Sequence, residues 1–151
     1  MKKILIFMGA LFLILIVVAI VGIIFANIKG TALDKESKQY VDDAIVHIVS
    51  DWDKQEFIKR ISPEFKRDVN DEDVNKHFAW CSKLGKLKEY KGSEGQSHIS
   101  LTTENGKVIT AKYTAKAEFE AGPADINVTI IKHGNEWQIL KWNVDSNAIS
   151  E

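Results

Sequence analysis

The feature that most constrains this chain is a long apolar run near its N-terminus, from Ile4 to Ile28, that contains no charged residue. An α-helix rises about 1.5 Å per residue and the hydrocarbon core of a bilayer is about 30 Å thick, so about 20 apolar residues can cross it. The run is long enough to do so. The sequence therefore predicts a transmembrane anchor over residues 1–28.

A cleaved secretory leader is the alternative, since Lys2 and Lys3 give the run a positively charged start. Leaders have shorter apolar regions, of about 7 to 15 residues, that end in a small-x-small cleavage site. The exit of this run, GIIFANIKG, offers no clean site of that kind. A retained anchor is the favoured interpretation.

The lysines around the run predict its orientation. Lys2 and Lys3 precede it and Lys29 follows it, which favours a cytoplasmic N-terminus, although Lys35 and Lys38 reduce the bias. We expect a single-pass membrane protein whose C-terminal domain lies outside the cytoplasm.

The remainder of the chain has the size of one ordinary domain. We expect a linker over residues 29–33, with Gly30 breaking the helix, and a domain over residues 34–151. A net charge of −1 with interspersed lysines and glutamates argues against nucleic-acid binding. A single cysteine, Cys81, excludes an intramolecular disulfide framework.

Hydrophobic spacing predicts three helices in this domain. The first covers residues 34–51, and the second follows it and is closed by Pro63. The third lies in DEDVNKHFAWCSKLG and ends at Gly85. Their predicted buried strips are Tyr40, Val41, Ala44, Ile45, Ile48 and Val49; Phe57, Ile58 and Ile61; and Val74, Phe78, Cys81 and Leu84.

The pattern then changes to the period of two that is typical of strands. KLKEYKG and QSHISLTT are expected as two separate strands, and the Asn-Gly of ENGK as a hairpin turn. KVITAKYTAKAEFEAG alternates apolar residues, from Ile109 to Ala121, with polar ones, which indicates a sheet covered on one face. INVTIIK and EWQILKWNV complete an antiparallel meander.

The last strand contains a break in parity. Trp137 and Ile139 share one parity, whereas Trp142 and Val144 share the other. A β-bulge near Leu140 and Lys141 would place all four on the same side of the sheet. We therefore predict a bulge there.

Helices followed by a meander predict a two-layer α+β domain, with three helices packed on a curved antiparallel sheet. The order resembles the nuclear-transport-factor-2-like and cystatin-like superfamily. More narrowly, ISPEF, LGKLKEYKG and AEFEAGPADINVTIIKHGNEWQILKWNV resemble segments of small bacterial membrane-anchored proteins of unknown function. The resemblance implies a cone-shaped pocket, and the superfamily includes isomerases, dehydratases, cyclases and non-catalytic modules.

Candidate pocket-lining residues are Tyr113, Phe119, Trp137 and Trp142. Tyr113 is on the inward parity of its strand, but no Asp shares that strand and Asp125 falls on the outward parity of the next. An isomerase-type site needs a carboxylate base beside such a donor. The sequence therefore predicts no catalytic residue.

Metal and cofactor sites are not expected either. His47, His77, His98 and His133 match no metal-binding spacing, and DVNDEDVN lacks the glycine and glutamate of a calcium loop. Cys81 lies one turn after His77, but it shares the apolar face of its helix and is expected to be structural.

Two functional classes remain. The first is a membrane-tethered, non-catalytic module that binds a ligand or a protein and includes accessory or assembly factors of membrane complexes. Its partner, or a second copy in a homodimer, would use the outer sheet face of Thr114, Lys116, Glu118, Asn127 and Thr129. The alternative is an isomerase or cyclase acting on an apolar small molecule inside the cone. The missing inward carboxylate favours the first class.

Overall fold

A computed structural model describes the backbone of residues 2–149 and the side chains of residues 13–21, 23 and 31–149. The chain divides into two compact units, Met1–Leu33 and Asp34–Glu151. Among the described residues we find no helix that is long and apolar enough to cross a membrane. The predicted span, Ile4–Ile28, falls largely outside the residues whose side chains are described.

The first helix, α1, runs without interruption from Lys2 to Val49. The predicted helix break at Gly30 is therefore wrong. A glycine in a helix interior costs about 1 kcal/mol relative to alanine, which weakens a helix without ending it. The 48-residue helix tolerates Gly30 as well as the earlier Gly9 and Gly22.

Four shorter helical elements follow: α2 (Lys54–Arg60), α3 (Pro63–Asp68), α4 (Asp71–Cys81) and the 3₁₀ turn η1 (Ser82–Leu84). Side chains of Asp53, Ser62 and Asn70 cap the three α-helices by accepting backbone N–H groups. Helix α3 was not predicted. Pro63 closes the preceding segment as expected, but it also opens α3, because proline suits the first position of a helix.

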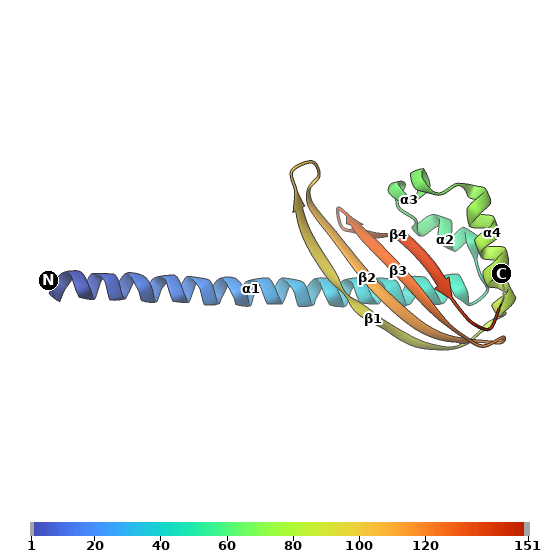
Figure 1. The fold of residues 1–151 in the computed structure, drawn as a ribbon, viewed down its shortest axis with the longest axis horizontal. Coiled ribbons are helices and arrows are strands. Elements are labelled where there is room, and N and C mark those ends of the chain that lie inside the picture. Colours follow the sequence, from blue (N-terminus) through green and yellow to red (C-terminus); the bar gives the residue numbers. More distant parts are fainter. Residues whose placement is uncertain (1, 150–151) are drawn as a thin grey trace. The chain divides into compact units, whose positions relative to one another are not determined.

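The sheet is an open antiparallel meander in the order β1-β2-β3-β4 (Figure 1). Its strands are β1 (Leu87–Thr102), β2 (Gly106–Phe119), β3 (Pro123–His133) and β4 (Glu136–Asp145). The predicted α+β class and the meander are confirmed.

The prediction of two separate strands before the ENGK turn is wrong, because β1 is continuous across GSEGQS. Its pairing with β2 shifts register between Tyr90 and Ser93, where Gly92 has a φ of 92°. A side chain at Gly95 would overlap the backbone of Lys112 and Tyr113. Gly92 therefore permits a bulge in β1, and Gly95 permits a close contact between β1 and β2.

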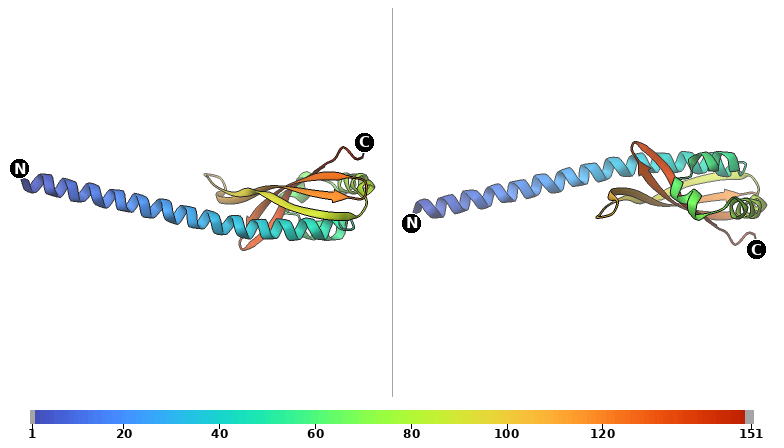
Figure 2. Two further views of the ribbon diagram at one scale, coloured as in Figure 1. Left: turned by 90° about the horizontal axis from the view of Figure 1, so that it is seen from below. Right: turned by 90° about the horizontal axis from the view of Figure 1, so that it is seen from above.

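The core lies between one face of the sheet, here called the inner face, and the helices. On β2 the alternation predicted from sequence buries Ala111, Tyr113, Ala115, Ala117 and Phe119. The domain part of α1 runs along the sheet (Figure 2) and buries Val41, Ala44, Ile45, Ile48 and Val49. Ala121 was expected on the inner face, but it follows the end of β2 and is exposed.

The predicted bulge in β4 is confirmed. Thr129 pairs with Lys141 and Ile130 with Ile139, so Leu140 is the extra residue. Just before the bulge, Ile139 also forms a parallel bridge with Ile61, and its carbonyl accepts the Ser62 N–H at 2.8 Å. The segment that joins α2 to α3 thus covers part of the edge of β4.

Candidate functional site

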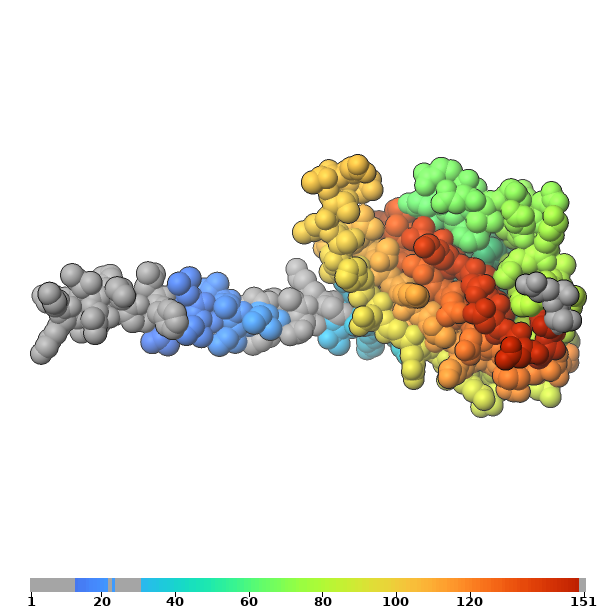
Figure 3. All heavy atoms as spheres, viewed as in Figure 1, coloured from blue at the N-terminus to red at the C-terminus, as the bar shows by residue number. Residues whose placement is uncertain are grey.

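The largest groove described lies at the β4 bulge and has a volume of about 740 Å³. We call it the outer groove, because much of it is formed by side chains on the sheet face opposite the core, which is the face seen in Figure 3. Its lining combines lysine, amide and hydroxyl groups with apolar side chains: Phe65, Asp68, Val69, Thr110, Lys112, Asn127, Thr129, Leu140, Lys141, Trp142 and Asn143.

The bulge explains this mixture. Lys112, Thr129 and Lys141 are paired across three strands and form one polar row on the outer face. Trp142 pairs with the buried Val128 and therefore has the opposite parity, and its ring lies 5.4 Å from that of Phe57. The extra residue, Leu140, brings apolar surface to the end of the polar row.

The two candidate tryptophans line different grooves. Trp142 lines the outer groove and a smaller one of about 290 Å³ beside Phe57 and Phe78. Trp137 lines a groove of about 440 Å³ with Tyr40 and Arg60. Within the described part of the chain, the buried indole N–H groups of Trp137 and Trp142 have no acceptor.

The other two candidates, Tyr113 and Phe119, are buried and line none of these grooves. Phe119 stacks on Trp52 at 5.2 Å. The Tyr113 hydroxyl lies 2.7 Å from Ser37 Oγ and donates to the Asp34 carbonyl at 3.0 Å. The four residues therefore do not meet in one groove among those described.

A cluster that sequence reasoning missed joins α1 to β1, and we call it the polar seam. Tyr90 and Ser93 each donate to one oxygen of Asp42 at 2.6 Å, and Lys38 donates to the other at 2.6 Å. About two turns earlier on α1, the Asp34 carboxylate accepts the N–H of Ser97 at 2.7 Å and also its hydroxyl.

The signal for the seam was present in the sequence. Asp34, Lys38 and Asp42 recur every four residues and so share one stripe of a helix. The hydroxyls of β1 face that stripe and explain why the carboxylates sit at the edge of the core.

The seam is poorly suited to proton abstraction. Burial alone would raise the pKa of Asp42, but hydrogen bonds from Lys38, Ser93 and Tyr90 outweigh it and hold the pKa below its ordinary value. Burial is the largest cause raising the pKa of Tyr113, and the nearby Asp34 charge adds to it. Asp42 is thus a weak base with bonded oxygens, and Tyr113 stays protonated.

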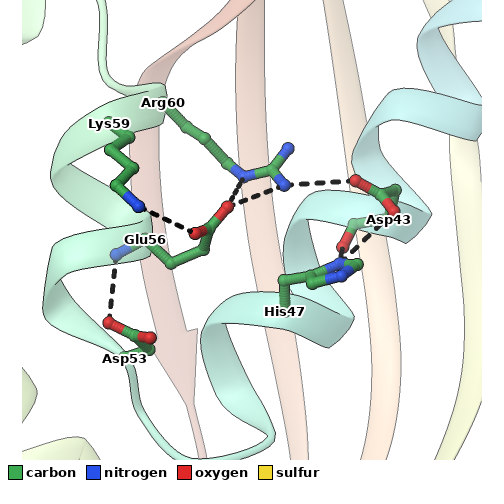
Figure 4. A network of polar contacts seen from close by, with 6 residues as sticks. All are labelled: Asp43, His47, Asp53, Glu56, Lys59 and Arg60. Atoms are coloured by element: carbon green, nitrogen blue, oxygen red, sulfur yellow. Dashed lines mark hydrogen bonds and ion pairs between the residues drawn. The ribbon is translucent and has the colours of Figure 1, made fainter.

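A second polar network joins α1 to α2 around Arg60 (Figure 4). The Arg60 guanidinium lies 2.9 Å from Glu56 and 3.2 Å from Asp43, and it sits 5.8 Å from the centre of the Tyr40 ring. Desolvation would lower the pKa of Arg60, but the surrounding carboxylates raise it overall. The arginine is neutralised within the chain, so this network fastens α2 to α1.

Cys81 is buried at the end of α4, with its sulfur 3.4 Å from His77 Nε2. Burial raises the pKa of the Cys81 thiol to about 12 and lowers the pKa of His77. A raised thiol pKa disfavours the reactive thiolate at neutral pH. The burial of Cys81 on the apolar face of α4 agrees with the prediction. Within the described residues, no group of three or more His, Cys, Asp or Glu is placed to hold a metal ion.

No protein family matches this chain, and no curated protein matches it.

Proposed function

We propose that this chain is a single-span membrane-anchored protein whose extracytoplasmic domain is a non-catalytic module for binding a ligand or a protein partner. In this proposal the domain has a nuclear-transport-factor-2-like or cystatin-like architecture. An accessory or assembly role in a membrane complex fits the same arrangement. The outer groove is the binding surface that we assign to it.

The observation that carries the proposal is the exposure of the apolar side chains described on α1. Nine large hydrophobic residues there have between 42% and 63% of their surface exposed: Leu13, Ile14, Leu15, Ile16, Val17, Val18, Ile20, Val21 and Ile23. They are nearly consecutive, so they point in all directions around the helix. A helix that is apolar on every side requires an apolar environment, which a bilayer supplies.

The outer groove supports a binding role. Its volume falls within the range of small-molecule sites, about 300 to 1,000 Å³, and it combines apolar side chains with a few polar groups, as such sites do. Lys112 and Lys141 flank Thr129 on its floor. An elongated partner with an apolar end and an acidic or carbonyl-rich end would match this lining.

An isomerase or cyclase remains the competing function, because the seam does supply carboxylates near Tyr113 that sequence reasoning had not expected. Their oxygens accept bonds from Ser97, Tyr90, Ser93 and Lys38, and the Tyr113 hydroxyl is bonded to Ser37 and Asp34. Because these groups are engaged in hydrogen bonds within the chain, the seam is better suited to a structural role than to catalysis. This favours the binding module.

Two measurements test the proposal. The full chain should remain in the membrane pellet after alkaline extraction, and a Val17→Arg, Val18→Arg variant should be released, whereas Val17→Leu should not. A photocrosslinking residue at Leu140 in the outer groove should capture a partner or ligand that the same residue at exposed Ala121 does not. Extraction of the unmodified chain would refute the anchor, and equal capture at both positions would refute the groove.

A further inference from the structure

Strand β4 is an edge strand of the sheet, and its edge is only partly paired (Figure 1). The Ile139 carbonyl accepts the Ser62 N–H, and Ile61 forms a parallel bridge with Ile139, so the link between α2 and α3 pairs with β4 as a strand would. The chain then turns into α3 at Pro63. Within the described residues, no backbone hydrogen bond from outside the sheet reaches residues 140–145. The edge of β4 is therefore open beyond the bulge.

The backbone of β4 directs hydrogen-bonding groups to this open edge. In a strand, the face of the side chain and the direction of the backbone N–H and C=O groups alternate together. Ile139 is buried on the inner face, and its carbonyl points to the edge. The bulge at Leu140 places Trp142 and Val144 on that same face, so their N–H and C=O groups also point to the edge. Unpaired groups of this kind are a template for a further strand.

The outer groove lies along this open edge. Consecutive residues of β4, from Leu140 to Asn143, line it, and the end of α3 contributes Phe65, Asp68 and Val69. Consecutive strand residues have opposite parities, so the groove reaches both faces of the sheet. An extended segment in the groove would have its backbone beside β4 and its side chains alternating between the two faces.

On the inner side such a segment would meet apolar surface. The outer groove is continuous there with the groove of about 290 Å³, because Phe65, Val69 and Trp142 line both. Most side chains of this smaller groove are aromatic or aliphatic, so it suits an apolar side chain. Its carboxylate, Asp73, disfavours an acidic side chain on this side.

The outer side is cationic. Lys112 and Lys141 are exposed there, with Thr129 between them in the row that crosses the sheet. In the part of the chain that the structure describes, neither lysine forms an ion pair. The carboxylate of the groove lining, Asp68, lies 3.3 Å from its neighbour Arg67. Acidic side chains on this side of an added strand would neutralise the lysines.

From these observations we infer that the outer groove binds an extended segment of a partner protein. The segment pairs with β4 as a fifth strand and alternates apolar with acidic side chains. This inference rests on the binding role proposed above for the outer groove and names its occupant. A lipid or another molecule without backbone amides could not bond the edge. A second copy of β4 would bring two Lys141 side chains to one face, where like charges repel.

Synthetic peptides test the inference on the full chain in detergent. The probe is a fluorescein-labelled peptide of about eight residues, the length of an ordinary strand, in which valine and glutamate alternate. A control peptide has the same composition in two blocks. Two further peptides carry N-methyl groups on the valine or on the glutamate nitrogens, because either set faces β4 depending on the direction of the strand. Fluorescence anisotropy measures the dissociation constants.

The alternating peptide should bind about tenfold more tightly than the block peptide, and one of the two N-methylated peptides should lose binding. Lys141→Glu should weaken binding of the alternating peptide by about fivefold, whereas Lys116→Glu, exposed on the same face but outside the groove, should not. The bound peptide should also slow hydrogen exchange at the amides of Trp142 and Val144, which NMR measures.

The outcomes separate the inference from the proposed function. Equal binding of the alternating peptide and both N-methylated peptides would overturn strand pairing, while the groove would stand as a binding site. Strand pairing would also be overturned if no peptide bound but a photocrosslinking residue at Leu140 captured a small molecule or a second copy of the chain. If no peptide bound and capture at Leu140 equalled capture at Ala121, the inference and the groove would fail together.

Discussion

Two contacts hold the helices against the sheet, and they are built from different interactions. Along β1, α1 is fastened by the polar seam, in which Asp34 and Asp42 accept bonds from Ser97, Tyr90 and Ser93. At the opposite edge of the sheet, α2, α3 and α4 meet β4 through an aromatic cluster: Phe57, Phe65, Phe78 and Trp142, with ring centroids of Phe57 5.0 to 5.5 Å from the other three.

The difference indicates that the two contacts have different roles in the fold. Hydrogen bonds are directional, and each bond in the seam adds only about 0.5–1.5 kcal/mol of net stability. Apolar packing is less directional, but each large aromatic side chain removed from water contributes several times more. We therefore expect the aromatic cluster to stabilise the domain and the seam to set the register of α1 on the edge strand.

The largest effect should come from the aromatic cluster. Phe57→Ala should lower the free energy of unfolding of the full chain in detergent by about 3–5 kcal/mol, since Phe57 is almost fully buried at the centre of the cluster. Tryptophan fluorescence during urea titration measures it. Leu101→Ala, at an exposed site, is the control and should change little. A loss below 1 kcal/mol for Phe57→Ala would contradict the assignment of stability to the aromatic cluster.

Removing the Tyr113 hydroxyl, which lies beside the seam, should lower the free energy of unfolding by less. Tyr113→Phe deletes the bonds to Ser37 and Asp34 but keeps the ring, and Ser37 retains its own bond to the Asp34 carbonyl at 3.2 Å. We expect a loss of about 1 kcal/mol, the net contribution of a typical hydrogen bond. The same urea titration measures it, and a loss as large as that of Phe57→Ala would show that the hydrogen bonds between α1 and the sheet are also a main source of stability.

The elements that sequence predicted well are those whose signal is local and repeated. The alternation in β2 identified its buried face, and the parity change between Ile139 and Trp142 located the bulge at Leu140. Gly85 was expected to end a helix and does so with a φ of 79°. In each case the residues that determine the structural feature lie within one short segment of the sequence.

The wrong predictions concern features that depend on tertiary contacts rather than on local sequence. Gly92 and Gly95 look like breakers between two strands, but pairing with β2 carries β1 through them. The candidate pocket assumed that Tyr113, Phe119, Trp137 and Trp142 surround one space. Tyr113 is instead buried with its hydroxyl on Ser37, and Phe119 is buried with its ring stacked on Trp52. The outer groove depends on α3 lying near β4, which no local pattern indicates.

The seam should also give the domain a dependence on acid. The pKa of Asp42 lies below its ordinary value of 3.8 in the folded state. Its contribution to stability is therefore complete above that value and is lost as the pH falls through the lower folded-state pKa.

Comparison of the native chain with Asp42→Asn measures this contribution. The free energy of unfolding should differ at pH 6 by no more than about 1 kcal/mol, since the carboxylate is partly exposed, and the difference should shrink below pH 4. Asp125→Asn, at an exposed carboxylate of β3, is the matched control. A difference that grows on acidification would have the wrong sign and would refute the assignment.

The smallest effect should come from removing the Lys38–Asp42 ion pair of the seam while its hydroxyl bonds stay in place. Lys38 donates to Asp42 four residues away on the same helix, and both side chains are partly exposed. Lys38→Gln should lower the free energy of unfolding by about 0.3–0.5 kcal/mol, and added salt should abolish the difference. The bonds from Tyr90 and Ser93 join two elements and should keep their effect in salt. If Lys38→Gln lowers the free energy of unfolding more than Tyr90→Phe does at high salt, the assignment is refuted. The hydroxyl bonds would then not be what sets the register of α1 on β1.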